Sequence, residues 1–270
     1  MTKATAPSMG TTTPSGEPGR WVPQFLSLAV FWGCSFAFIG ISLESLTPVQ
    51  VAFWRLFLGA VTLAVIVVVT RTRLPDDLRT WAHLAVVAAF LNAVPFTLFA
   101  IGQQHVSSVL AAIINAATPL VTLLVVIAAF PEEKPTWFRG LGLATGFAGI
   151  LVVLGVWRTL PEGELRGVVA CLAAIACYGI AFPYSRRYLR DTGVRPAGLA
   201  AGQVGMATMM LLPVVLITGV KPTSPLTGRV IIAMLALGAF SSGIAYILNF
   251  HVVAQAGATT ASSVTYLTPV

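Results

Sequence analysis

The sequence has few charged residues. Asp, Glu, Lys and Arg make up only 9% of its 270 residues, whereas soluble domains carry roughly 25%. Hydrophobic residues reach 57%, and a water-soluble domain of this length would need far more polar residues to cover its surface. The composition therefore excludes a soluble protein and predicts one that is embedded in a lipid bilayer.

Residues of the types that catalyse reactions or bind metals are also scarce. The three cysteines, Cys34, Cys171 and Cys177, lie in apolar segments without paired spacing, which indicates neither a disulfide framework nor a metal site. No acidic residue falls inside a predicted membrane span, and the chain has only three histidines. A membrane enzyme would need a nucleophile with a base, paired carboxylates or metal ligands. We therefore predict no enzymatic activity, no cofactor and no metal.

The basic residues are dispersed along the chain. The net charge is +7, but Lys and Arg fall in short loops between apolar runs, which argues against a nucleic-acid partner. Residues 1–20 are rich in Thr, Ser, Pro and Gly and cannot bury a core, so we predict a disordered tail. No apolar stretch follows the early charge as it would in a secretory signal peptide.

The apolar runs have the length of membrane-spanning helices. A span needs about 20 apolar residues, and we find eight complete candidates, at 24–43, 48–69, 81–101, 109–130, 137–156, 167–184, 197–220 and 230–250. A ninth begins near Thr260 and is cut off at Val270. A helix ending inside the bilayer would leave carbonyls unsatisfied. We therefore expect a C-terminally truncated ten-helix protein with about eight and a half helices present.

Loop charge predicts the orientation. With the N-terminus in the cytoplasm, eleven Lys and Arg residues fall on the inner side and four on the outer side. This is the asymmetry of the positive-inside rule. Arg outnumbers Lys thirteen to three, which is typical of a GC-rich bacterial genome. We predict a multi-pass protein of the bacterial inner (plasma) membrane, with residues 1–20 as a cytoplasmic tail.

Two stretches that lie 150 residues apart resemble each other. Residues 91–120 and 241–270 align without gaps and share Leu98/Leu248, Ala111/Ala261, Thr118/Thr268 and Pro119/Pro269. This predicts two repeats, at 21–157 and 158–270. Because five helices per repeat is an odd number, the second repeat must be inverted relative to the first. Many secondary transporters have this plan, with the solute site near the midplane between the repeats.

Several motifs follow one another in a recognisable order. They are WGCSF at 32–36, PVQVAFWR at 48–55, NAATP at 115–119, EEKPTW at 132–137 and a Gly-rich run at 140–155. In this order and spacing the chain resembles an EamA-type permease of the drug/metabolite transporter superfamily. The resemblance implies ten helices in two five-helix repeats with both termini cytoplasmic. It also implies export of amino acids, other small metabolites or drugs.

Arg55 is the leading candidate for solute binding. It is the only Arg or Lys inside a predicted span, and a charge at that depth should face protein or a water-filled cavity. One role would be to hold the carboxylate of an anionic or zwitterionic solute. The alternative is a structural arginine that caps carbonyls of a neighbouring helix or extends to the membrane surface.

Polar and aromatic residues at mid-depth complete the predicted site. Singly, such residues often only bond or pack between helices, but aromatic walls with a few polar groups are typical of a small-molecule pocket. We predict that the substrate-binding residues are Trp32, Ser35, Arg55, Asn92, Asn115, Tyr178, Tyr246 and Tyr266.

The sequence leaves the solute and the driving force open. One alternative is a nucleotide-sugar or sugar-phosphate transporter, although phosphate binding should bring several intramembrane Lys or Arg and only Arg55 is present. Without an acid in the spans, proton coupling has no evident carrier, and facilitated diffusion or exchange fits as well. The expected partners are a small-molecule solute and the lipid bilayer, and the chain is either a monomer or a homodimer.

Overall fold

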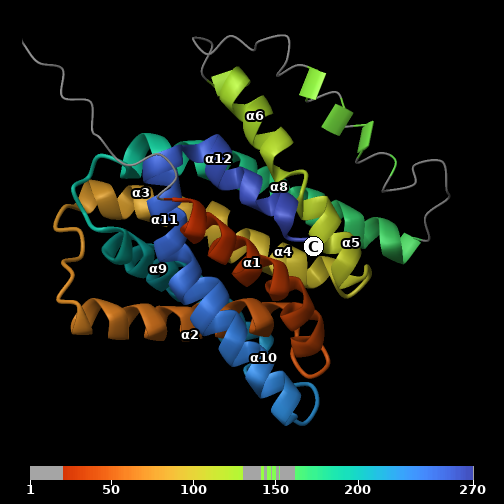
Figure 1. Cartoon of the computed structure of the whole chain (residues 1–270). Coiled ribbons are helices and arrows are strands. Elements are labelled where there is room, and N and C mark those ends of the chain that lie inside the picture. Colours follow the sequence, from red (N-terminus) through yellow and green to blue (C-terminus); the bar gives the residue numbers. More distant parts are fainter. Residues whose placement is uncertain are drawn as a thin grey trace, which may run out of the picture.

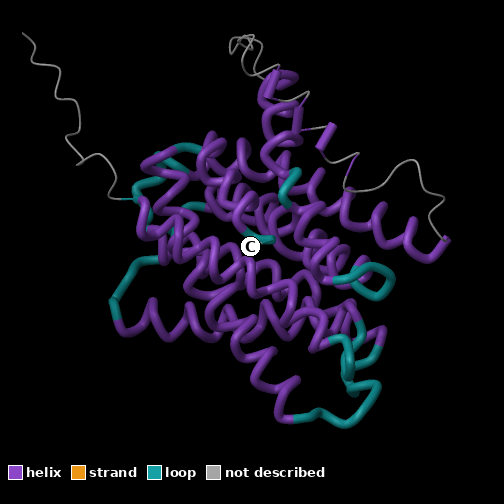
Figure 2. Tube along the Cα trace, turned by 45° about the vertical axis from the view of Figure 1, so that its right-hand side comes forward, coloured by secondary structure: helices purple, strands orange, loops and turns teal. Residues whose placement is uncertain are grey.

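The structure is a computed structural model that describes residues 21–129 and 162–269, with a few positions between them (141–142, 145–146, 148–149 and 152). The predicted tail 1–20 lies outside the described residues, as does most of the predicted span 137–156. Every regular element in the described part is a helix (Figures 1 and 2). Seven helical segments there are long and apolar enough to cross a membrane: Val22–Ser42, Pro48–Val69, Leu78–Gly102, Ser108–Val125, Gly163–Leu189, Pro196–Thr218 and Gly228–Ala256. The prediction of an all-α integral membrane protein is confirmed.

The first repeat begins with two uninterrupted helices and continues with two interrupted ones. Its elements are α1 (Val22–Ser42), α2 (Pro48–Val69), α3 (Leu78–Ala88), the π-helical turn η1 (Ala89–Ala93), α4 (Val94–Gly102), α5 (Ser108–Asn115) and α6 (Thr118–Ala129). Side chains cap several helix starts: Thr47 forms a capping box with Gln50, and Asp77 and Ser107 accept bonds from the first turns of α3 and α5. Such caps satisfy amides that have no partner within the helix.

The second repeat has the same order of elements. It consists of α8 (Glu162–Leu189), α9 (Pro196–Thr218), α10 (Gly228–Gly238), the π-helical turn η2 (Ala239–Ile244), α11 (Ala245–Ala256), α12 (Ala258–Ser262) and the 3-10 helix η3 (Ser263–Leu267). The predicted offset of 150 residues reappears in the helix boundaries. It relates the starts of α3 and α10, of η1 and η2, and of α5 and α12.

The two repeats are inverted relative to each other. The equivalent helices α2 and α9 pack side by side (Figure 1). At one end, Gln50 near the start of α2 donates from Nε2 to the carbonyls of Gly219 and Lys221, both at 2.8 Å, just after the end of α9. At the other end, a Cβ on Gly198 at the start of α9 would lie 2.5 Å from the Arg73 carbonyl oxygen, just after α2. The equivalent helices therefore run antiparallel.

One predicted span is broken. The structure divides the expected helix 109–130 at Ala116 and Ala117 into α5 and α6. Pro119 has no N–H, so the carbonyl of Asn115 four residues earlier loses its helical donor. The hydroxyl of Thr118 donates to this carbonyl at 2.7 Å and replaces the donor that Pro119 lacks, which a carbonyl in the bilayer requires.

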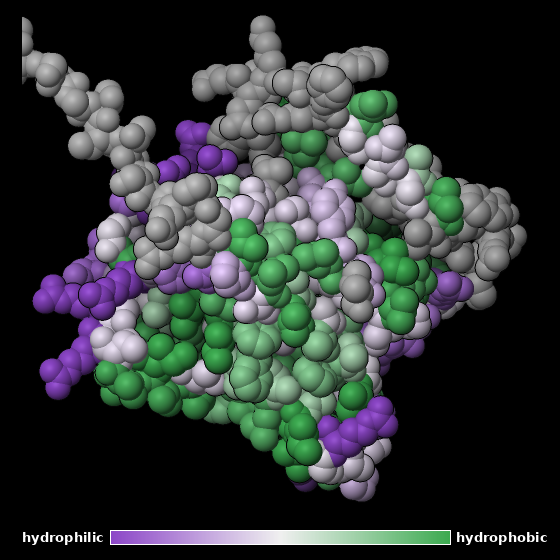
Figure 3. Space-filling model, in the orientation of Figure 1, coloured by the Kyte–Doolittle hydropathy of each residue, from purple (hydrophilic) through white to green (hydrophobic). Residues whose placement is uncertain are grey.

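The outer surface is apolar. In the orientation of Figure 1, hydrophobic residues cover much of the face over α1, α2 and α10 (Figure 3). Large hydrophobic side chains are exposed there and elsewhere, among them Val69 (75% exposed) and Ile217 (86%). A soluble protein would not leave so much apolar surface in contact with water, whereas lipid chains cover it without cost.

Candidate functional site

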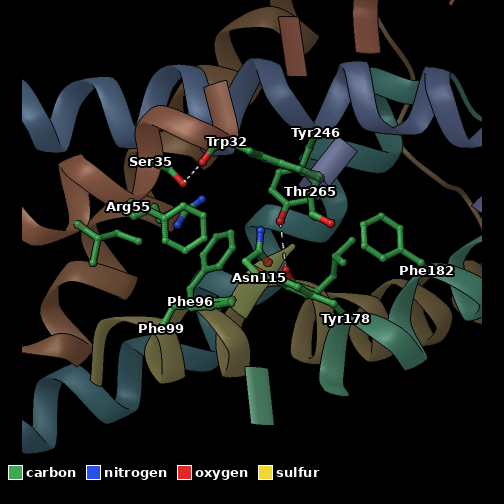
Figure 4. A pocket seen from close by; sticks show the side chains of 13 residues that line it. Trp32, Ser35, Arg55, Phe96, Phe99, Asn115, Tyr178, Phe182, Tyr246 and Thr265 are labelled. Carbon is green, nitrogen blue, oxygen red and sulfur yellow. Dashed lines mark hydrogen bonds between the residues drawn. The ribbon is translucent and has the colours of Figure 1, made fainter. Parts of the chain in front are cut away.

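A cavity lies at the centre of the bundle, between the two repeats (Figure 4). Both repeats contribute to its wall, the first through α1, α2, η1, α4 and α5 and the second through α8, α11 and η3. Its volume for a water-sized molecule is about 30 Å³, which is room for only one or two waters. It is lined by Trp32, Ser35, Phe36, Ile39, Arg55, Leu91, Phe96, Phe99, Asn115, Tyr178, Phe182, Tyr246 and Thr265.

The π-helical turns lie where the repeats meet, and Leu91 of η1 lines the cavity. In the first repeat, Pro95 lacks the N–H that would bond to Leu91, and the hydroxyl of Tyr246 donates to that carbonyl instead, at 3.1 Å. In the second repeat, the carbonyl of Ser241 accepts a bond from Trp32 Nε1 at 3.2 Å. Leu91 and Ser241 are equivalent under the 150-residue offset. In each repeat, therefore, the carbonyl at the equivalent position of the π-helical turn accepts a hydrogen bond from an aromatic side chain of the other repeat.

Arg55 supplies the positive charge of the cavity. Its side chain is buried (4% exposed), its Nε donates to Ser242 Oγ at 2.7 Å, and the guanidinium carbon lies 3.5 Å from the centroid of the Phe96 ring. No acidic side chain pairs with it in the described part of the chain. The bond to Ser242 and the ring fix the position of the charge, while the structure records no hydrogen bond from the outer guanidinium nitrogens to a described residue. Those nitrogens can bind a carboxylate in a bidentate manner.

A second polar pair repeats this arrangement behind the cavity wall. Gln203 is the seventh residue after the proline that opens α9, as Arg55 is the seventh after the proline that opens α2. Gln203 Nε2 donates to Asn92 Oδ1, and Asn92 is equivalent to Ser242. Each of these two helices therefore donates to the π-helical turn of the other repeat.

Aromatic rings enclose the remaining space. Trp32 and Tyr246 are in edge contact at 6.0 Å between ring centroids, as are Phe36 and Phe99 at 5.4 Å. The ring centroids of Tyr178 and Phe99 are 5.8 Å apart. Such walls bind apolar or aromatic groups of a solute and fix their orientation.

The cavity contains six of the eight predicted residues. Trp32, Ser35, Arg55, Asn115, Tyr178 and Tyr246 line it together, and Figure 4 shows their side chains around the same space. These six residues come from five different helices, α1, α2, α5, α8 and α11, and meet at one site.

The other two predicted residues lie elsewhere. Asn92 is fully buried but bonded to Gln203 and absent from the lining. Tyr266 is 48% exposed, and its neighbour Thr265 lines the cavity instead. The segment is a 3-10 helix, in which residues three apart share one face, so Thr265 and Thr268 are buried and Tyr266 points away.

Several lining residues were missing from the prediction. Phe96 and Phe99 follow Pro95 on the repeated hairpin, and Phe182 follows Tyr178 by one helical turn. Their positions opposite Tyr246 and along α8 were available as signals, but phenylalanines are too common in membrane helices to stand out. Among the described residues, no acidic side chain lines the cavity and no group of three His, Cys, Asp or Glu is placed to hold a metal.

Comparison with known proteins decides the family. The sequence profile of the EamA-like transporter family matches the chain twice, at residues 19–155 and 165–270. The chain belongs to this family. The two matches correspond to the two inverted repeats, so the resemblance inferred from the motifs is confirmed.

Relatives of the protein include two bacterial proteins named as transporters. The chain is 24% identical over 247 residues to "Uncharacterized transporter YoaV" of Bacillus subtilis, covering 91% of this chain and 83% of that protein. It is 28% identical over 250 residues to "Uncharacterized inner membrane transporter YedA" of Escherichia coli K12, covering 90% and 78%.

A solved structure shares the fold. A chain titled "Crystal structure of protein" superposes with a TM-score of 0.68 at 18% identity, covering 92% of this chain and 84% of the other. This superposition shows the shared fold, and the family match identifies the protein as an EamA-family membrane transporter.

Proposed function

We propose that this EamA-family transporter exports a small amphipathic metabolite with a carboxylate group, such as an amino acid, across the bacterial inner membrane. The observation that carries the proposal is the guanidinium of Arg55, which is buried in the central cavity without an acidic partner in the described part of the chain. A buried cation without a counter-ion is costly, and a solute carboxylate would supply the missing charge. The N-terminus would lie in the cytoplasm, on the arginine-rich side.

The rest of the lining supports an amphipathic solute. Ser35, Asn115 and Thr265 line the cavity together with Arg55 and present oxygens that can accept hydrogen bonds, while the aromatic rings would hold an apolar side group. A nucleotide-sugar or a sugar phosphate is the less favoured alternative because Arg55 is the single cation among the described residues that line the cavity.

Transport would proceed by alternating access. The cavity is too small for such a solute in this conformation, so solute entry requires the repeats to move apart on one side. At one end, the loop after α1 is joined to the segment after α9 by Thr223 N–H to Ser45 O at 2.9 Å and Ser45 Oγ to Pro225 O at 3.1 Å. This end would be the sealed one.

Counterflow in proteoliposomes tests the proposal. Vesicles loaded with an unlabelled solute should take up its labelled form, and the panel would contain amino acids, nucleosides, cationic drugs and sugar phosphates. We expect flux for carboxylate-bearing solutes and little for cations. Flux of sugar phosphates alone would support the alternative, and absence of flux for every solute would contradict the proposal.

A matched pair of variants tests the role of Arg55. Arg55→Gln introduces the residue found at the equivalent position of the second repeat, which can still donate to Ser242 but carries no charge. We expect this variant to fold normally and to lose at least about tenfold in solute affinity, because a charged hydrogen bond contributes about 1.5–3 kcal/mol. Unchanged flux in Arg55→Gln would show that the charge does not bind the solute.

A further inference from the structure

A second polar pocket lies away from the central cavity, between the loop that follows α2 and the loop that precedes α9. It is open and has a volume of about 460 Å³ for a water-sized molecule, the size of an ordinary small-molecule site. We call it the arginine pocket. It is lined by Arg71, Arg73, Leu74, Asp76, Asp77, Thr192, Gly193, Val194 and Arg195.

The charges of the arginine pocket are not paired with one another. The structure records two ion pairs in the described part of the chain, Arg190–Asp191 and Arg229–Glu44, and neither includes Arg71, Arg73 or Arg195. Three arginines at the rim of one pocket repel each other and favour a bound anion. Their planar guanidinium groups match the geometry of a phosphate.

The two aspartates of the pocket differ in their roles. Asp77 Oδ1 accepts a bond from the backbone N–H of Thr80 at 2.7 Å and caps α3. The hydrogen bonds from Thr80 lower the pKa of Asp77 below its usual value. Asp76 is exposed, caps no helix and forms no ion pair in the part of the chain that the structure describes. Its carboxylate is therefore available to a cation beside the anion site.

Arg71 is held in an unusual backbone conformation. Its φ is +48°, and it follows the last residues of α2 at a position where glycine is the common choice. An arginine there costs backbone strain that glycine would avoid. A role of its side chain in anion binding would account for that cost.

Two exposed leucines belong to the same loop as the arginine pocket. Leu74 lines the pocket and is 42% exposed, and Leu78, which follows Asp77 in the sequence, is 85% exposed. Trp81 Nε1 donates to the carbonyl of Pro75 at 2.9 Å, and tryptophan prefers the level of the lipid headgroups. The pocket therefore lies where lipid headgroups and the first part of their chains meet the protein.

We propose that the arginine pocket binds the headgroup of a zwitterionic phospholipid with a primary ammonium, that is, phosphatidylethanolamine. The phosphate contacts Arg71, Arg73 and Arg195, the ammonium donates hydrogen bonds to Asp76, and Leu74 and Leu78 contact the acyl chains. A quaternary ammonium, as in phosphatidylcholine, has no N–H to donate to Asp76. The site therefore distinguishes the two headgroups. This site is independent of solute transport through the central cavity.

Lipid-dependent thermal stability tests the proposal, because a ligand that binds the native state raises Tm in a saturable way. The purified chain in detergent would be titrated with short-chain phosphatidylethanolamine, phosphatidylcholine and phosphatidylglycerol, and with inorganic phosphate. We expect the phosphatidylethanolamine response to saturate at a lower concentration than the others and inorganic phosphate to have little effect. A full response to inorganic phosphate would overturn the lipid assignment in favour of a soluble anion.

Variants separate the two halves of the headgroup. Arg73→Gln combined with Arg195→Gln should raise the half-saturating concentration of all three lipids roughly tenfold. Asp76→Asn should remove only the preference for phosphatidylethanolamine over phosphatidylcholine. Arg229→Gln, an exposed arginine in an ion pair with Glu44, serves as the control and should respond as the unmodified chain. An unchanged response of the double variant, or equal responses to the two zwitterionic lipids in the unmodified chain, would overturn the proposal.

Discussion

Arg55 and Gln203 occupy equivalent positions of the two inverted repeats, and each donates a hydrogen bond to the π-helical turn of the other repeat. Arg55 Nε reaches Ser242 on η2, and Gln203 Nε2 reaches Asn92 on η1. The inverted symmetry thus produces equivalent hydrogen bonds between the repeats at two places. The first repeat places a charge at its link and exposes it to the central cavity, whereas the second uses a neutral amide that stays behind the wall.

The buried hydrogen bond between Gln203 and Asn92 is expected to stabilise the fold. Asn92→Ala should lower the free energy of unfolding by about 1–3 kcal/mol, because it leaves Gln203 Nε2 buried without its acceptor. Gln203→Leu in the same chain should recover part of this loss. Unfolding in detergent with increasing denaturant measures both variants, and strictly additive losses in the double variant would show that the two amides do not interact.

The hydroxyl of Tyr246 should stabilise the fold because Pro95 lacks the N–H that would otherwise bond to the Leu91 carbonyl. Tyr246→Phe removes the hydroxyl that bonds to the Leu91 carbonyl, and we expect a loss of about 0.5–1.5 kcal/mol in the free energy of unfolding. Pro95→Ala returns an N–H four residues after Leu91. In that background Tyr246→Phe should therefore cost less.

The same thermal or denaturant unfolding experiment measures this double-mutant cycle. Tyr178→Phe is the control, since Tyr178 lines the same cavity but the structure records no hydrogen bond from its hydroxyl to a described residue. An equal cost of Tyr246→Phe with and without Pro95 would contradict the role given to the hydroxyl.

The close approach of α2 and η2 depends on Gly59. A Cβ at this position would lie 2.9 Å from Ser242 Cβ, so Gly59→Ala should displace η2 and weaken the bond between Arg55 and Ser242. Gly205→Ala on α9 is the matched control because open space surrounds it. It should be neutral or stabilise by about 0.4–1 kcal/mol.

Measuring both glycine variants by thermal unfolding and by solute counterflow distinguishes packing from a general effect of alanine. We expect lower Tm and lower flux for Gly59→Ala only. Equal behaviour of the two variants would contradict the tight contact.

At the end proposed to be sealed, the buried hydrogen bonds should contribute more to stability than the surface ion pair. Gln50 is 1% exposed and bonds to Gly219 and Lys221, whereas Glu44 and Arg229 form an exposed pair at 3.6 Å. Glu44→Gln should change stability by less than about 1 kcal/mol. Gln50→Ala should lower Tm clearly, because it removes both bonds between the repeats. A larger effect of Glu44→Gln would reverse this ranking.

Much of the fold could be predicted because the signals were of the kind that a bilayer imposes. Apolar runs gave seven spans that the structure contains, and the 150-residue offset gave the equivalence of the two hairpins. Arg55 was identified because a lone cation in an apolar run has few explanations. The inverted orientation of the second repeat followed from the odd number of helices expected in each repeat.

Other features could not be predicted from these signals. The apolar pattern does not reveal the π-helical turns or the break at Ala116, although Pro95 and Pro119 stand just after η1 and the break and predict a bend in each helix. The equivalence of Arg55 and Gln203 was hidden because α2 and α9 are offset by 148 residues, so the ungapped alignment misses it. Tyr266 was expected in the cavity as one of the aromatic residues at mid-depth, but the 3-10 geometry places its neighbour Thr265 there.

The central claim is that the charge of Arg55 binds a carboxylate of the solute, and one flux comparison tests it most directly. Counterflow of a transported carboxylate is measured beside its carboxamide analogue, in the unmodified protein and in Arg55→Gln. We predict that the unmodified protein prefers the carboxylate by at least about tenfold and that Arg55→Gln transports the two equally. A preference for the carboxylate that persists in Arg55→Gln would contradict the claim.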